Sequence, residues 1–358
     1  MSCYVVDRAA LAHNVSLLKK LCRKTPIWAV VKADGYGLGA ATFATELRKL
    51  GIDRFCVTEP WEAEALRNAG LKQEKILLLR PLTNDKELEQ MLQLQVILTL
   101  SSKDDAKRIH RVAKRPAAVH LKIDTGMGRY GFLPSEINDI PDLLRACPNV
   151  QVEGIFTHFN CAFSDELLTE QEFFAFENAV KRLQWLGIQT GEAHCCNSAA
   201  TLKFPSMYMD GVRVGSALLG RMPFDTKLTT LGYVETQVEE IRHLPSGHST
   251  GYGALWKAKG ERKIAIVPVG WFHGFNVSCQ PDRSTRRACL SGVLSEGKKL
   301  LRPKPLMVEV GGKLCPIVGA LGSLHCAIDV TNAPCTAGQT IRLQISPMHI
   351  KGMPIVFR

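Results

Sequence analysis

The chain has 358 residues, of which 46% are hydrophobic and 22% are charged, so it can form a barrel-sized domain plus a smaller one and is too apolar to be disordered. Its formal net charge of +11 is compatible with nucleic-acid binding, but the basic residues are scattered and are not interleaved with aromatic residues. We therefore expect no nucleic-acid partner, and an anionic substrate or cofactor would explain a basic site equally well.

The sequence also argues against a membrane, a signal peptide and a metal site. It has no run of about 18 uncharged apolar residues, and its start, MSCYVVDRAALAHN, lacks a basic flank followed by an apolar core. The 12 cysteines include no C-x-x-C spacing, and we expect them to be reduced. The adjacent Cys195 and Cys196 are interpreted as packing beside a site. We predict a cytoplasmic protein without a bound metal.

From residue 1 to about 220, short apolar runs alternate with longer amphipathic segments such as ATFATELRKLG and EQEFFAFENAVKRLQWLG. The runs are IWAVVKA, RFCVTE, KILLLR, VILTL, AVHLKID, VEGIFTHF, EAHCCNS and VRVGSALLG. Eight such alternations predict parallel strands in a TIM-type (β/α)8 barrel, whose chemistry lies at the C-terminal ends of its strands. Lys32, Arg129, His158 and Ser198 all fall at or just after the end of a predicted strand.

After about residue 230 the segments become short and β-branched, and Gly, Pro and Asn separate them, as in KIAIVPVG, PLMVEVGG and TIRLQI. We predict an α/β barrel over residues 1–230 and an all-β, strand-rich C-terminal domain over residues 231–358. The segment 281–304 carries seven Lys or Arg residues against two acids, and we interpret it as a solvated loop or hairpin.

Three interpretations of Lys32 compete, because it ends an apolar run and precedes the glycine-rich GYGLGA. It could be an ordinary lysine that reaches solvent. GYGLGA could be the G-x-G-x-x-A turn of a dinucleotide site, with Glu59 as the ribose acid, although Lys32 and Asp34 separate that turn from the strand. Lys32 could also form a Schiff base with pyridoxal 5'-phosphate (PLP), provided that burial or nearby cations lower its pKa.

The third interpretation gains support because VVKADGYGLG resembles the PLP-lysine signature of the alanine racemase family. Five further blocks resemble successive motifs of that family, in the family's order: HLKIDTGMGRYGF, IFTHFN, HCCNSAA, VRVGSALLG and TGYGALW. The resemblance implies a PLP-dependent amino-acid racemase that interconverts L-alanine and D-alanine and supplies D-amino acids for peptidoglycan. A racemase for serine or for a broader range of amino acids, or a weakly active PLP-binding homologue, stays open as the alternative.

The resemblance also implies a role for each matching residue. Lys32 and Tyr252 would be the two catalytic bases, one for each face of the substrate Cα, and the partner subunit of a homodimer would supply the tyrosine. Arg129 would contact the substrate carboxylate, and Lys122 matches a supporting lysine that is often carbamylated. The cofactor-binding residues besides Lys32 would be Tyr36, His158, Asn197, Ser198, Arg213, Gly215 and Ser216. Among these, Arg213 would face the pyridine nitrogen and His158 would extend toward Arg213.

The C-terminal part departs from the family pattern at four positions. Trp271 stands in for a tyrosine that lines the entry to the site, and Ser323 and Leu324 replace a Met-Asp pair that contacts substrate and gates the entry. Phe357 stands where the family has a tyrosine that contacts the phosphate. We keep Ser323 as a substrate-binding candidate and Trp271 as a supporting one, and we expect a changed entrance around retained bases.

Overall fold

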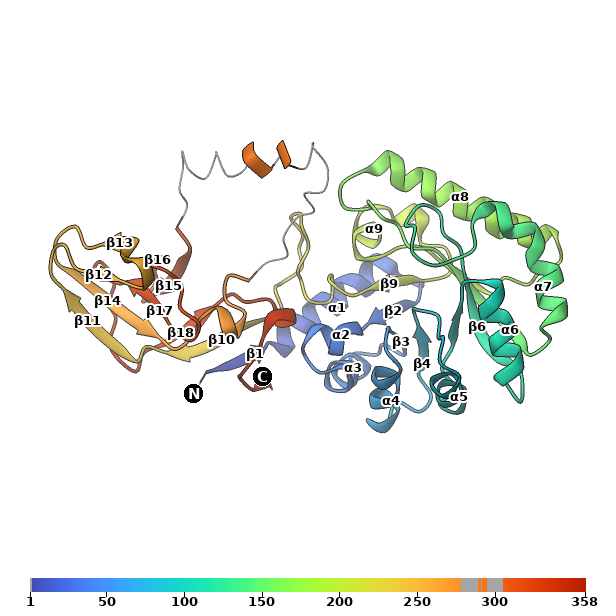
Figure 1. Ribbon diagram of the computed structural model, residues 1–358, viewed down its shortest axis with the longest axis horizontal. Coiled ribbons are helices and arrows are strands. Elements are labelled where there is room, and N and C mark those ends of the chain that lie inside the picture. The colour runs from blue at the N-terminus through green and yellow to red at the C-terminus, as the bar shows by residue number, and fades with distance from the viewer. Residues whose placement is uncertain (1, 278–288, 291, 295–304) are drawn as a thin grey trace. The chain divides into compact units, whose positions relative to one another are not determined.

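The computed structural model describes residues 2–277, 289–290, 292–294 and 305–358 (Figure 1). Most of the basic segment 281–304 therefore lies outside the described residues. The chain divides into two compact units, of which one is Arg8–Leu231 and the other joins the N-terminal segment up to Asp7 to Gly232–Arg358. None of the helices in the described part of the chain has the length and hydropathy needed to span a bilayer.

The first unit is built on eight short parallel strands. They are β2 (Ile27–Val30), β3 (Arg54–Val57), β4 (Lys75–Leu78), β5 (Leu98–Leu100), β6 (Ala117–Lys122), β7 (Val150–Phe156), β8 (Glu192–His194) and β9 (Val212–Val214). They pair in the orders β4-β3-β2-β9 and β5-β6-β7-β8. Parallel bridges between Leu77 and Ile97 and between His194 and Gly211 join the two sets into a closed ring. The predicted (β/α)8 barrel is confirmed.

Helix α1 precedes the first barrel strand, and the other helices of this unit follow barrel strands along the chain (Figure 1). The helices are α1 (Arg8–Cys22), α2 (Lys32–Tyr36), α3 (Ala40–Lys49), α4 (Pro60–Asn68), α5 (Asp85–Gln93), α6 (Lys103–Val112), α7 (Ile140–Ala146), α8 (Glu166–Trp185) and α9 (Ser198–Lys203), with 3-10 turns at Pro134–Asp139 and Pro205–Met207. Most residues of these strands are apolar because both of their faces are covered, and Trp28, Val30, Cys56, Leu77 and Ile97 form one buried cluster between them.

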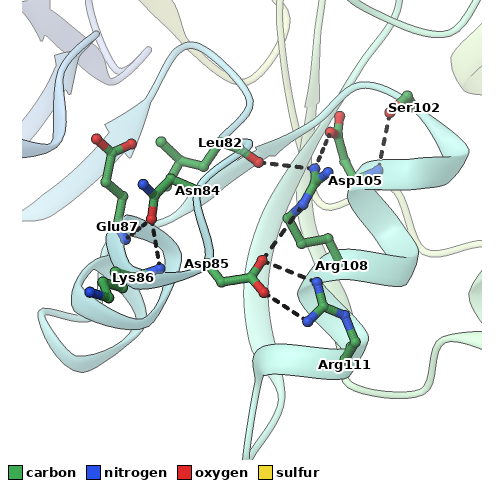
Figure 2. Close-up of polar contacts among 9 residues, drawn as sticks. All are labelled: Leu82, Asn84, Asp85, Lys86, Glu87, Ser102, Asp105, Arg108 and Arg111. Carbon is green, nitrogen blue, oxygen red and sulfur yellow. Dashed lines mark hydrogen bonds and ion pairs between the residues drawn. The ribbon is translucent and has the colours of Figure 1, made fainter.

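Figure 2 shows how the neighbouring helices α5 and α6 begin and how they are joined. Asn84 caps α5 by accepting from the Lys86 N–H at 2.9 Å, and Ser102 caps α6 by accepting from the Asp105 N–H at 3.1 Å. Asp85 then pairs with Arg111 of α6 at 2.7 Å. Because this ion pair is largely exposed, it contributes little to stability, and the apolar faces of the helices hold them to the barrel.

The described part of the second unit is built mainly of β-strands and 3-10 turns, which confirms the predicted β-rich domain. One sheet has the order β18-β10-β1-β19, a second has the order β11-β14-β17-β16-β15, and β12 pairs with β13. The strands are β1 (Cys3–Val6), β10 (Gly232–Gln237), β11 (Glu240–Leu244), β12 (Ser249–Thr250), β13 (Trp256–Lys257), β14 (Arg262–Val267), β15 (Met307–Val310), β16 (Lys313–Val318), β17 (Cys326–Asp329), β18 (Thr340–Leu343) and β19 (Ile355–Phe357).

The N-terminal strand β1 belongs to this second unit, whereas the predicted boundary assigned residues 1–230 to the barrel. β1 pairs antiparallel with β10 and parallel with β19, so Val6 lies opposite both Gly232 and Phe357. Four apolar residues directly before a helix look like a first barrel strand, and only the long-range pairing places them elsewhere.

Candidate active site

One residue, Val31, separates Lys32 from β2, so Lys32 lies at the carboxyl end of a barrel strand, as predicted. The next turn, assigned to α2, is left-handed: φ is 53° at Ala33, 53° at Asp34, 64° at Gly35 and 57° at Tyr36. A left-handed turn costs about 1–2 kcal/mol for each residue with a Cβ. Three of these four residues carry a Cβ, so the surrounding structure must hold this turn in place.

The carboxylate of Glu62, in the first turn of α4, supplies much of that support. Glu62 is fully buried, and its Oε1 accepts from the backbone N–H of Asp34 at 2.8 Å. Its Oε2 accepts from the N–H of Thr58 at 2.9 Å and from the N–H of Glu59 at 3.0 Å. Asp34 in turn accepts from the Ala40 N–H at 2.8 Å. One buried anion thus ties the turn after β2 to the turn after β3.

The environment of Lys32 lowers the pKa of its amine. Burial is the main cause, the positive charge of Arg129 adds to it, and Glu62 opposes it. A lowered pKa increases the fraction of neutral amine at neutral pH, which is the form that acts as a nucleophile or a base.

Ser198, Gly215 and Tyr36 come together beside this lysine, since β2 and β9 are neighbours in the barrel. The Ser198 hydroxyl accepts from the N–H of Gly215 at 2.9 Å and from the N–H of Ala217 at 3.2 Å. A Cβ on Gly215 would lie 1.9 Å from the Tyr36 hydroxyl oxygen, so only glycine allows this approach. Burial raises the pKa of Tyr36, so its hydroxyl stays protonated and can donate.

Asn197 and Ser216 flank this cluster. The Asn197 side chain caps α9 by accepting from the N–H groups of Ala199 and Ala200, both at 3.1 Å. It also donates to the Phe159 carbonyl at 3.2 Å, which ties the loop after β7 to the start of α9. Ser216 follows Gly215 in the loop after β9 and is half-buried.

Arg213 is buried in β9, and its guanidinium makes four hydrogen bonds inside the barrel. Nη1 donates to His194 Nδ1 at 2.6 Å and to the His194 carbonyl at 2.8 Å. Nη2 donates to the carbonyls of Thr157 at 2.5 Å and Cys195 at 3.2 Å. A guanidinium has five N–H donors, so these bonds leave the Nε–H for another acceptor.

The imidazole that hydrogen-bonds to Arg213 is that of His194, and the extension of His158 toward Arg213 stays a prediction. Burial and the charges of Arg213, Arg129 and other nearby cations lower the pKa of His158, so His158 is neutral beside the site. No role was assigned to His194 from the sequence, in which it was named only within the segments EAHCCNS and HCCNSAA. The signal that could have singled it out is its position at the end of β8, next to the strand that carries Arg213.

Arg129 lies on an exposed loop after β6, and Asp124 shapes that loop. The Asp124 carboxylate accepts from the backbone N–H of Gly126 at 3.0 Å, of Gly128 at 3.1 Å and of Arg129 at 3.1 Å. The loop is therefore folded around one carboxylate, and the Arg129 side chain extends from it.

Lys122 ends β6 and is only 3% exposed. Burial, followed by the charges of Arg129 and Arg213, lowers the pKa of Lys122 to about 8. Its Nζ lies 5.3 Å from the Tyr130 ring centre and 5.5 Å from that of Phe156. A substantial fraction of this amine is neutral near pH 8, as carbamylation by CO2 requires.

In the second unit, Tyr252 is 77% exposed in the 3-10 turn Tyr252–Ala254 and lines a cavity of about 390 Å³. Ser323 and Leu324 line the same cavity, and so does His325, which the sequence analysis did not single out. The Trp271 N–H donates to the Gly322 carbonyl at 3.0 Å, so the segment that carries Trp271 pairs with the one that carries Ser323. Phe357 lies in β19 and does not line this cavity.

Two family models cover most of the chain. The alanine racemase N-terminal domain matches residues 6–223, and the alanine racemase C-terminal domain matches residues 232–349. The chain belongs to the alanine racemase family. Members of this family are isomerases and are generally PLP-dependent.

Individual relatives agree with the family models. The chain is 33% identical to the alanine racemase of Desulforamulus reducens over 338 residues, which is 91% of this chain and 84% of that protein. It is 32% identical to the alanine racemase of Clostridium tetani, with 91% and 81% covered. The crystal structure of the biosynthetic alanine racemase from Pseudomonas aeruginosa has a TM-score of 0.82 and 26% identity and covers 100% of this chain and 99% of that one.

Family membership and geometry both disfavour the dinucleotide interpretation. Glu59, the candidate ribose acid, pairs with Arg80 at 2.7 Å and caps α4. The glycines after β2 form the left-handed turn of a barrel loop, not the opening of a helix on an open sheet.

Proposed function

We propose that this chain is a PLP-dependent alanine racemase that interconverts L-alanine and D-alanine with two bases, Lys32 and Tyr252. The observation that carries the proposal is the grouping of an amine, a hydroxyl cradle and a buried guanidinium at one end of the barrel. The cradle of Tyr36, Ser198 and Gly215 suits a phosphate, because a Cβ at Gly215 would fill it. The Arg213 Nε–H suits a ring nitrogen that accepts a hydrogen bond.

When bound, PLP supplies an electron-withdrawing ring that makes the Cα–H of an attached amino acid acidic. The residues of this chain do the rest. Lys32 Nζ removes or returns the Cα proton on one face, and the Tyr252 hydroxyl does so on the opposite face, as racemisation requires. Arg129 binds the substrate carboxylate, and its charge adds to burial in lowering the pKa of the Lys32 amine.

A homodimer with shared sites is part of this proposal. Tyr252 is exposed on its own unit, which leaves its hydroxyl accessible to a second subunit, as the family resemblance implies. We also propose a cytoplasmic location and a role in supplying D-alanine for peptidoglycan.

Mixing two inactive variants tests the two bases and the shared site together. Lys32→Ala and Tyr252→Phe chains are purified, mixed in equal amounts and allowed to exchange subunits. Half of the dimers should be mixed, and each should have one intact site of two, so about a quarter of the wild-type activity should return. Mixing Tyr252→Phe with a Lys32→Ala/Tyr252→Phe double variant is the matched control and should restore nothing.

If the subunits exchange completely and no activity returns, the shared site is contradicted. High activity of the unmixed Tyr252→Phe chain would remove Tyr252 from the mechanism.

Racemisation of serine or of a broader range of amino acids is the second candidate, and the cavity around Tyr252 favours the larger or more apolar substrates of that range. Leu324 gives this cavity an apolar wall where the family has an aspartate, and Leu324 is 48% exposed. Comparing kcat/KM for alanine, serine and larger amino acids decides between the two candidates.

A further inference from the structure

Behind Arg213, two buried histidines continue its hydrogen-bond chain away from the site. Arg213 Nη1 lies 2.6 Å from His194 Nδ1, and His194 Nε2 lies 2.8 Å from His120 Nδ1. His194 is fully buried and His120 is 1% exposed. The proposed reaction assigns no role to His120, which lies in the middle of β6, two residues before Lys122.

The arginine determines which ring nitrogen of His194 and of His120 carries a proton. The Nη1–H can only donate, so His194 Nδ1 must accept. Burial and the nearby charge of Arg213 lower the pKa of His194, so this imidazole is neutral and carries its one proton on Nε2. That proton points at His120 Nδ1, which must accept it. Burial lowers the pKa of His120 to about 3, so its single proton lies on Nε2.

Packing fixes both rings in place. His194 is stacked between Trp28, at 5.8 Å between ring centres, and Phe156, at 5.3 Å. The His120 ring meets the Trp28 ring edge-on at 5.5 Å. A Cβ on Gly154 would lie 2.5 Å from His120 Nε2, so this glycine makes room for the imidazole. These contacts confine both rings within the barrel interior.

We propose that His120 is a positioning residue for Arg213: by accepting the Nε2 proton of His194, it fixes the direction of the hydrogen-bond chain and holds the guanidinium in one orientation. The proton order is a property of the folded barrel. Its effect on PLP and on racemisation rests on the proposed function.

The proton order is tested without any reaction. The chain is labelled with 15N-histidine, and long-range 1H–15N spectra are recorded at pH 7 with and without PLP, with His120→Asn and His194→Asn used for assignment. Both histidines are expected as neutral Nε2–H tautomers. A proton on Nδ1 of either ring, or a doubly protonated ring, overturns the proposal even if the protein proves to be an active racemase.

The positioning role is tested with three variants and PLP labelled with 15N in its ring. His120→Leu removes the acceptor, and Gly154→Ala displaces His120 without changing it. His120→Asn places an amide oxygen near the position of Nδ1 and should recover most of the loss. His110→Leu, at a half-buried histidine of α6 that contacts Asn149, is the matched control.

His120→Leu and Gly154→Ala should each shift the ring-15N signal of PLP and lower kcat about tenfold with little change in KM, the size expected when one buried donor loses its acceptor. His110→Leu should do neither. An unchanged ring-15N signal in both variants, or an equal shift in His110→Leu, overturns the positioning role. If PLP does not bind at all, the proposed function fails, while the tautomer measurement on the free protein still decides the proton order.

Discussion

Replacing Gly215 by alanine tests the phosphate cradle directly. The φ of Gly215 lies outside the left-handed region, so an alanine backbone fits there, but its Cβ would lie 1.9 Å from the Tyr36 hydroxyl oxygen and 2.8 Å from its Cζ. Normal contact needs about 3.5 Å, so the hydroxyl must move by about 1.5 Å. A charge-assisted hydrogen bond to phosphate should then be lost, at about 1.5–3 kcal/mol, which weakens PLP binding about 10- to 150-fold.

The assay is PLP dissociation, measured by fluorescence on the wild type, Gly215→Ala, Tyr36→Phe and the double variant. Tyr36→Phe removes the same hydroxyl without a clash, so it should weaken PLP by a similar factor. The double variant should be no weaker than the worse single variant, because both changes remove one contact. Thermal unfolding of each variant separates this effect from loss of fold. The reasoning is refuted if Gly215→Ala binds PLP as tightly as wild type, or if the two losses add.

Three further predictions concern the entrance and Lys122. Leu324→Asp should move selectivity, measured as relative kcat/KM, toward alanine and away from larger amino acids, and no movement would mean that Leu324 does not shape the entry. Phe357→Tyr should restore a phosphate contact and tighten PLP by about one to two decades, and an unchanged dissociation constant would refute that match. Lys122→Met should stabilise the CO2-free protein by up to about 3 kcal/mol at pH 7, because it removes a buried lysine whose pKa is lowered to about 8. This gain should shrink as pH rises from about 8 to 10.5, where only the unfolded lysine stays charged, and a pH-independent gain in denaturant unfolding would contradict the lowered pKa.

The sequence predicted the barrel because eight short apolar runs and their helices carry a strong local signal. The same pattern predicts even β5 and β8, which are only three residues long. It does not specify β1, whose partners β10 and β19 lie more than 200 residues away along the chain. Local patterns predict that a strand exists, and long-range pairing determines the sheet that it joins.

A residue of the candidate site could be predicted where its own position in the sequence indicates its role. It could not be predicted where its role depends on contacts with residues distant in the sequence. Lys32, at a strand end before glycines, was singled out in this way, and the structure places it at the end of β2. The left-handed turn after it was not predicted, because Ala33 and Tyr36 rarely adopt a positive φ, although Asp34 is of a residue type that does so more often. The sequence does not distinguish Glu62 from any other acid in the first turn of a helix. Only the fold brings its carboxylate to the Asp34 N–H.

Backbone contacts hold the segment of Tyr252 independently of the side chains that line its cavity. Gly251, with φ of 77°, lies so close to the next segment that a Cβ would be 2.7 Å from the Ala320 nitrogen, and a Cβ on Gly319 would be 2.3 Å from the Thr250 carbonyl. These close contacts between glycines and the main chain fix the position of the turn that contains Tyr252. The hydrogen bond from Trp271 N–H to the Gly322 carbonyl is likewise independent of side chains. Substitutions at 323 and 324 therefore change the chemistry of the cavity wall without moving the tyrosine, so substrate selectivity and the proposed two-base chemistry should vary separately.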